Sequence, residues 1–229
     1  MRKLQFLLVA TLLLISCSID FSKKNNSQEC IKIWNNYLNS WGNSEDIAKI
    51  ESAIMTTRYS TNEGVGEDKV IIKYPDRLVH EMTLPNGCHV KHILNRNKAI
   101  SISFEGVKPL DSQFIIDYKE AALIIPEFHF QKLGYKFNLL DDEIIKNRLC
   151  YRIKIEKPQS SSVYYIVKDS LKLVKAVYKD YVIEVIESKR FSGILLACKV
   201  KYMSSRDTML LDTDFQFNVD VNDSVFNIK

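Results

Sequence analysis

Glycine and proline are both scarce in this sequence, with 7 Gly and 5 Pro among 229 residues. That composition excludes collagen-like and low-complexity chains. An excess of charge of one sign is missing too, since the formal net charge is only +4 although 26% of the residues are charged. A nucleic-acid-binding domain usually carries a clustered basic surplus. We therefore expect no nucleic-acid partner.

The motifs of common catalytic and metal sites are also missing. There is no Gly-x-Ser-x-Gly elbow, no His-Glu-x-x-His and no Cys-x-x-Cys. The segment 64–66 lacks the third glycine of a phosphate loop, and the segment 212–214 lacks the glycine of a calcium loop, where Phe217 stands. His89 and His92 would point to opposite faces of a strand, so they do not form a metal pair. The sequence predicts no catalytic residue, no metal and no cofactor.

No apolar run is long enough to cross a bilayer, which takes about 20 residues. The longest, Leu4–Ile15, follows a basic start and is typical of a secretory signal peptide. It ends in Leu-Ile-Ser-Cys17, which resembles the bacterial lipobox. The resemblance implies a signal peptide at 1–16, acylation of Cys17 and a lipidated tether at 17–26. The alternative is an ordinary signal peptide whose cleavage site contains a cysteine.

Four further cysteines are spread along the chain: Cys30, Cys88, Cys150 and Cys198. An exported protein can form disulfides, and four cysteines allow three pairings. Each of these cysteines has apolar neighbours in sequence, which is typical of buried free thiols. The sequence alone is compatible with disulfides and with free thiols.

The periodicity of apolar residues changes once along the chain. Between Ser27 and Gly42 they recur at steps of three and four, which predicts a helix, and a short second helix opens at Ser44. From Ile54 onward, apolar and polar residues alternate, with turn signals between the runs. Asp111 is placed to cap one more helix, which Pro126 interrupts. The clearest alternating runs are 77–84, 99–104, 149–156, 194–202 and 214–221.

About eleven antiparallel strands with one apolar face cannot lie flat, so the sheet must curl. The sequence therefore predicts an α+β fold, mainly antiparallel β, in which a half-open barrel is covered by a helical lid from 27–50 and 110–134. We expect a single domain over 27–229. The inward apolar side chains are candidates to line a cavity, with plain core packing as the alternative for each; they are Leu78, Met82, Ile100, Ile102, Phe104, Phe114, Tyr118, Tyr151, Ile153, Phe215 and Phe217.

Several segments follow a known order of helix, strands and turns. They are the helix that ends near Trp41, the stretch Val70–Arg77, the hairpin Ser162–Asp169 with Leu173–Lys175, and the closing Phe217–Phe226. In this order they resemble the LolA/LolB-like outer-membrane lipoprotein-sorting proteins. The resemblance implies an incomplete barrel with a helical lid over an apolar cavity that holds acyl chains.

Together these features predict a lipoprotein of the bacterial cell envelope that is not an enzyme and binds lipid or lipoprotein acyl chains. We expect the membrane as a partner through acylated Cys17. The outer membrane, facing the periplasm, is the expected location. One alternative is a structural envelope lipoprotein that docks on another envelope protein and whose concave face is filled. Another is an envelope hydrolase with an unrecognised site.

Overall fold

The computed structural model describes residues 27–228. The predicted signal peptide, the acylation site Cys17 and the tether lie outside the described residues, so these three features stay predictions. Among the described residues, no helix is both long and apolar enough to cross a membrane.

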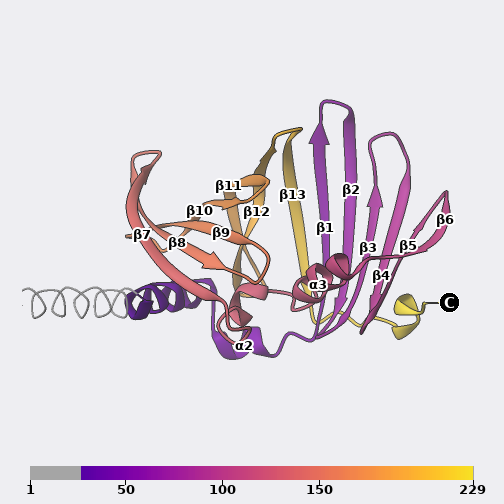
Figure 1. Ribbon diagram of the computed structural model, residues 1–229, viewed down its shortest axis with the longest axis horizontal. Coiled ribbons are helices and arrows are strands. Elements are labelled where there is room, and N and C mark those ends of the chain that lie inside the picture. Colours follow the sequence, from indigo (N-terminus) through magenta and orange to yellow (C-terminus); the bar gives the residue numbers. More distant parts are fainter. Residues whose placement is uncertain (1–26, 229) are drawn as a thin grey trace, which may run out of the picture.

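One antiparallel sheet organises the fold (Figure 1). Its strands are β1 Ser52–Thr61, β2 Gly64–Lys73, β3 Arg77–Thr83, β4 His89–Asn95, β5 Lys98–Ser103, β6 Gly106–Pro109, β7 Lys136–Ile145, β8 Arg148–Glu156, β9 Ser161–Val167, β10 Leu173–Tyr178, β11 Tyr181–Phe191, β12 Ile194–Ser204 and β13 Thr208–Phe217. Each strand pairs with its neighbour in sequence, except that β13 returns to pair with β1, so that β6 and β7 end up at the two edges. The sheet is therefore open, as the sequence predicts.

The helical segments lie close to their predicted positions. The first helix covers 27–41 within the described residues, and α2 is Ser44–Ala48. In α3, Ser112–Ala121, the Asp111 carboxylate accepts the Phe114 N–H at 3.0 Å, which is the predicted cap. Pro126 opens the short 3-10 helix η1, Pro126–His129. A second 3-10 helix, η2, covers Asp223–Phe226.

Both faces of the sheet bury apolar side chains. Helix 27–41, α2 and the segment 121–130 cover one face, which we call the helix-covered face. Residues 219–228 cover part of the other, where Phe226 and Val221 pack on Val79 and Ile93. Adjacent strand residues point to opposite faces, so Leu78 belongs to the helix-covered core while Val79 lies beneath the C-terminal segment.

Three details differ from the sequence-based prediction. The sheet has 13 strands rather than about eleven, and β6 is too short to show an alternation. The predicted strand 214–221 ends at Phe217, because Asn218 takes a φ of 53° and its side chain accepts the Glu51 N–H at 2.9 Å. That turn sends the rest of the chain to the other face of the sheet. Along β3–β5 the sheet therefore buries apolar side chains on both faces, whereas the sequence predicts one apolar face.

The cysteines at 30, 88, 150 and 198 are free thiols, and three of them are buried. Burial, with the nearby charge of Glu29, raises the pKa of the Cys30 thiol to about 12. Such a thiol is unreactive near neutral pH. Cys30 therefore acts as a small core residue.

Candidate functional site

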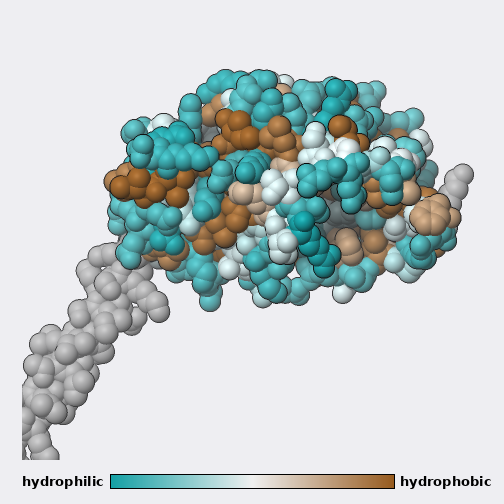
Figure 2. All heavy atoms as spheres, turned by 90° about the horizontal axis from the view of Figure 1, so that it is seen from above, coloured by the Kyte–Doolittle hydropathy of each residue, from teal (hydrophilic) through white to brown (hydrophobic). Residues whose placement is uncertain are grey.

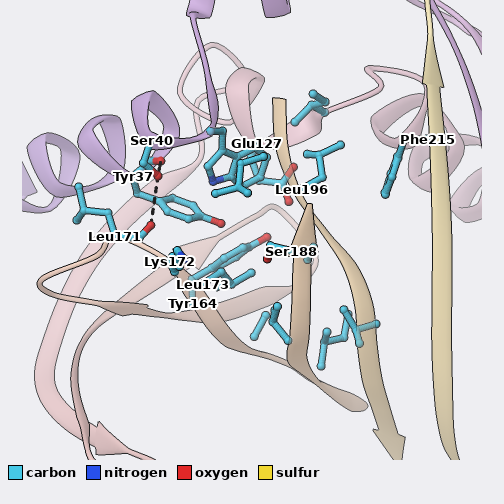
Figure 3. Close-up of a pocket in the computed structure, with 18 of the residues that line it drawn as sticks. Tyr37, Ser40, Glu127, Tyr164, Leu171, Lys172, Leu173, Ser188, Leu196 and Phe215 are labelled. Carbon is cyan, nitrogen blue, oxygen red and sulfur yellow. Dashed lines mark hydrogen bonds between the residues drawn. The ribbon is translucent and has the colours of Figure 1, made fainter. Parts of the chain in front are cut away.

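A cavity of about 300 Å³ lies between helix 27–41, η1 and strands β9–β13. Most of the side chains around it are apolar (Figure 3). Its lining consists of Tyr37, Ser40, Trp41, Ile124, Ile125, Glu127, Tyr164, Leu171, Lys172, Leu173, Ala176, Tyr178, Ile183, Val185, Ser188, Leu195, Leu196, Ala197, Val200, Phe215 and Phe217. This combination of an apolar lining with a few polar groups is typical of small-molecule sites.

Trp34 fixes the helix that forms one wall of the cavity. Its side chain is fully buried and contacts four aromatic rings at centroid distances of 5.2–6.1 Å, namely Tyr37, Phe130, Phe137 and Tyr164. These rings come from the helix, the 121–135 segment, β7 and β9. The position of Tyr37 in the wall therefore depends on packing between distant parts of the chain.

Hydrogen bonds tie the end of this helix to the sheet. The Ser40 hydroxyl donates to the Tyr37 carbonyl at 2.6 Å and lies 3.3 Å from the Leu171 carbonyl, as the dashed lines in Figure 3 mark. The Arg190 guanidinium donates to the Trp41 carbonyl at 3.2 Å. The helix terminus is thus held against both the β9–β10 loop and β11.

Polar groups gather at the end of the cavity near the helix. The hydroxyls of Tyr164 and Tyr178 lie 3.4 Å apart. Figure 3 shows the Tyr37 and Tyr164 hydroxyls and the Glu127 carboxyl directed into the cavity. We call Tyr37, Glu127, Tyr164 and Tyr178 the polar pole. None of these four residues is predicted from the sequence, although Glu127 is the one acidic residue in the apolar stretch 121–130.

A strained turn sets the direction of Glu127. Ile124, just before η1, has a φ of 66°, a conformation that is costly for a β-branched residue. Its side chain is buried in the helix-covered core, which holds the turn in place. Nearby, Glu120 forms an ion pair with Lys157, whose ammonium lies 4.7 Å from the centre of the Phe130 ring. This partly buried pair closes the helical segment over the end of β8.

Burial raises the pKa of the Glu127 carboxyl above its ordinary value of 4.5, and the charge of Glu120 adds to the effect. Lys157 and the Tyr164 hydroxyl act in the opposite direction and offset it only in part. Burial likewise holds the pKa of Tyr37 and Tyr164 well above 10. The tyrosines therefore remain hydrogen-bond donors at any physiological pH.

The raised pKa of Glu127 predicts how a Glu127→Gln variant responds to pH. A raised pKa stabilises the folded state fully below pH 4.5, and this contribution is lost as the pH rises through the folded-state pKa. Glutamine keeps the shape without the charge, so we expect the variant to be several degrees more stable than the parent at pH 8. The two should unfold alike near pH 4. Thermal unfolding of both proteins between pH 4 and pH 8 checks this prediction. A difference in stability that does not depend on pH would contradict it.

The predicted cavity residues are dispersed in the structure. Phe215 and Phe217 line the cavity. Met82, Ile102 and Phe104 line a separate, more open groove of about 700 Å³ at the ends of β3–β5. Of the rest, Leu78 and Ile153 lie in the buried core, Tyr118 and Tyr151 pack against it, Ile100 lies under the C-terminal segment, and Phe114 is exposed.

A cluster of rings holds α3 on the sheet. The Tyr118 hydroxyl lies 2.5 Å from Nδ1 of His92 and 3.2 Å from Nδ1 of His80. Burial and the neighbouring His80 lower the pKa of His92. Within 27–228, no group of three or more His, Cys, Asp or Glu side chains is placed to bind a metal. We interpret the cluster as a structural contact between α3 and strands β3 and β4.

Apolar side chains at the surface form separate patches. On the face that Figure 2 shows, they lie scattered among hydrophilic side chains rather than gathered in one belt. The most exposed is Phe104, at 86%, beside the edge strand β6. The internal cavity is therefore the better candidate for an apolar ligand.

This arrangement defines an open antiparallel half-barrel with helices on one face and an apolar cavity beneath them. No protein-family model matches the sequence, and no curated protein matches it. Several solved structures match the fold. A DUF1329-family protein from Desulfovibrio piger has a TM-score of 0.62 at 14% identity, over 86% of this chain and 97% of its own.

Two further matches are solved structures of a LolA-superfamily protein and of a lipoprotein-sorting protein domain. A LolA-superfamily protein from Nitrosomonas europaea has a TM-score of 0.58 at 13% identity, over 85% of this chain and 97% of its own. An outer membrane lipoprotein-sorting protein domain from Vibrio parahaemolyticus has a TM-score of 0.57 at 13% identity, over 88% and 97%. The chain therefore has the LolA-type fold, which confirms the predicted resemblance.

Proposed function

We propose that this protein is a lipoprotein of the bacterial cell envelope, anchored through acylated Cys17, that binds an acyl chain in the cavity. The observation that carries the proposal is the cavity of about 300 Å³ with its mainly apolar lining. Transfer of apolar surface from water into such a lining contributes about 25 cal/mol per Å². The likeness in fold to lipoprotein-sorting proteins supports the same role.

The cavity has room for one acyl chain. A volume of 300 Å³ corresponds to about ten water molecules at roughly 30 Å³ each, and a methylene group is of similar size. A chain of roughly ten to twelve carbons fits, whereas the several chains of one lipoprotein would need the cavity to widen. We therefore propose a single acyl chain as the ligand of this conformation.

We further propose that binding involves no chemical step. A nucleophilic serine needs a base within hydrogen-bond reach. The Ser40 hydroxyl instead contacts two backbone carbonyls. No histidine belongs to the cavity lining. This supports a carrier or acceptor role over that of a hydrolase.

Neighbouring residues of β11 provide a direct test. Val185 lines the cavity, whereas Ile186 is 56% exposed. We expect Val185→Trp to fill the cavity and weaken binding of a fluorescent twelve-carbon alcohol at least tenfold, while Ile186→Trp binds like the parent. Fluorescence titration of the full-length chain measures both. Equal binding by the two variants would contradict a ligand in this cavity.

Mass spectrometry of protein purified from membranes tests the remaining parts of the proposal. We expect the native complex to carry one single-chain lipid, and the intact mass to show loss of residues 1–16 with acylation of Cys17. A chain that never retains lipid would favour the alternative role of docking on another envelope protein. The exposed edge strand β6 and Phe104 are the surface available for such a partner.

A further inference from the structure

The polar pole contains more hydrogen-bonding groups than the binding of an acyl tail requires. The Tyr37 side chain is only 1% exposed, and among the described residues its hydroxyl has no hydrogen-bond partner of good geometry, although Trp41 lies beside it. A buried hydroxyl without a hydrogen-bond partner destabilises the protein. A purely hydrocarbon ligand would leave this destabilisation in place, so the pole points to a ligand with a polar group of its own.

The hydroxyls of the pole form an incomplete hydrogen-bond set. The hydroxyls of Tyr164 and Tyr178 form one hydrogen bond at 3.4 Å, in which either oxygen could be the donor. The Tyr37 hydroxyl is directed into the same space, and its hydrogen is free to be donated to a ligand (Figure 3). Glu127 faces them and interacts with the Tyr164 hydroxyl. The cavity thus offers the Tyr37 O–H as a free donor, with the Tyr164 hydroxyl and the Glu127 carboxyl beside it as further hydrogen-bonding groups.

The charges around the pole select against ionic head groups. Among the described residues, an ionic head group would find no free buried counter-charge, because Glu120 is paired with Lys157 and burial favours the uncharged form of Glu127. Lys172 is the one cation among the described lining residues, and it is exposed to solvent. An uncharged oxygen, in an ester carbonyl or a hydroxyl, pairs with the tyrosine donors at no cost in buried charge.

The cavity wall formed by β11–β13 is apolar apart from Ser188. Its apolar side chains include Ile183, Val185, Leu195, Val200, Phe215 and Phe217. A ligand with its head at the pole would lay its tail along these strands. The lining therefore has one polar and one apolar part, as a single-chain amphiphile has.

Resting on the proposed acyl-binding function, we infer that the cavity recognises single-chain amphiphiles with an uncharged oxygen-bearing head, which the Tyr37 and Tyr164 hydroxyls bind. Monoacyl esters of glycerol and long-chain alcohols are the ligand class. The tail supplies most of the affinity and the hydroxyls select the head.

Binding of twelve-carbon compounds to the full-length, delipidated chain tests this inference. Monododecanoylglycerol and dodecanol should bind at least tenfold more tightly than dodecylamine or dodecyl phosphate, measured by displacement of a fluorescent twelve-carbon alcohol. Tyr37→Phe and Tyr164→Phe should each weaken the binding of monododecanoylglycerol about fivefold, since a neutral hydrogen bond contributes about 1 kcal/mol. Tyr151→Phe, which lies outside the cavity lining, serves as the matched control and should bind like the parent.

The outcomes separate this inference from the proposed function. If Val185→Trp blocks all the compounds while Tyr37→Phe and Tyr164→Phe bind normally, the pole takes no part in recognition and only this inference fails. Tighter binding of the amine or the phosphate would overturn it as well. If no compound binds, the proposed function fails with it.

Discussion

Trp34→Ala is expected to lower the free energy of unfolding by about 3–5 kcal/mol, the usual cost of truncating a buried large aromatic side chain. Trp34 is fully buried, and its ring contacts Tyr37, Phe130, Phe137 and Tyr164. These contacts join helix 27–41 to the sheet. Their loss removes the main attachment of the wall that carries Tyr37, so binding of acyl ligands should fall in parallel. Urea unfolding and fluorescence titration measure the two effects.

Trp34→Phe separates packing from polarity at this position. Among the described residues, the indole N–H of Trp34 has no hydrogen-bond partner, so phenylalanine removes an unpaired buried donor along with some volume. We expect it to cost less than half as much as alanine. Ile116→Ala, on the exposed side of α3, is the surface control and should change stability by no more than about 0.5 kcal/mol. A Trp34→Ala variant as stable as this control would show that the helix is held elsewhere.

The course of the chain was largely predictable, because the sheet depends on local alternation. Asp111 caps α3 and Pro126 ends the helical pattern, since both act through the backbone next to them. The alternating run 149–156 forms β8, and its predicted inward side chains Ile153 and Ile155 are fully buried. Such features need only the period of a strand or the chemistry of a cap.

The cavity was not predictable in the same way, because it forms where distant segments fail to fill the space between them. Alternation identifies Phe215 as inward but cannot say whether a neighbour reaches it. Ile100 has the same alternation, yet its face is covered by the C-terminal segment. The polar pole brings together Tyr37, Glu127 and Tyr164 from three elements, and no spacing in the sequence links them. Local periodicity therefore predicts the sheet, whereas the site depends on tertiary packing.

The C-terminal segment is the clearest case of a tertiary effect hidden in an alternating pattern. Phe226 is fully buried against Val79 and Ile93, and the Arg77 guanidinium lies 5.5 Å from the centre of its ring. The Asn95 side chain donates to the Phe226 carbonyl at 3.1 Å. Asp223 in the same segment forms ion pairs with Arg77 and Lys73, which lower its pKa. The Phe226 ring, the smaller Val221 and a few polar contacts thus hold the segment.

Phe226→Ala should therefore release this segment and expose the outer face of β3 and β4. Truncating a buried phenylalanine usually lowers the free energy of unfolding by about 3–5 kcal/mol. A terminal segment can detach by itself, however, so the loss of global stability is limited to the cost of exposing Val79 and Ile93. We expect faster amide exchange across 219–228 and stronger binding of an apolar dye, with ligand affinity nearly unchanged because the cavity lies on the other face. Phe104→Ala, at the exposed β5–β6 turn, should change none of these. Unchanged exchange across 219–228 in Phe226→Ala would show that the ion pairs of Asp223 hold the segment without the ring.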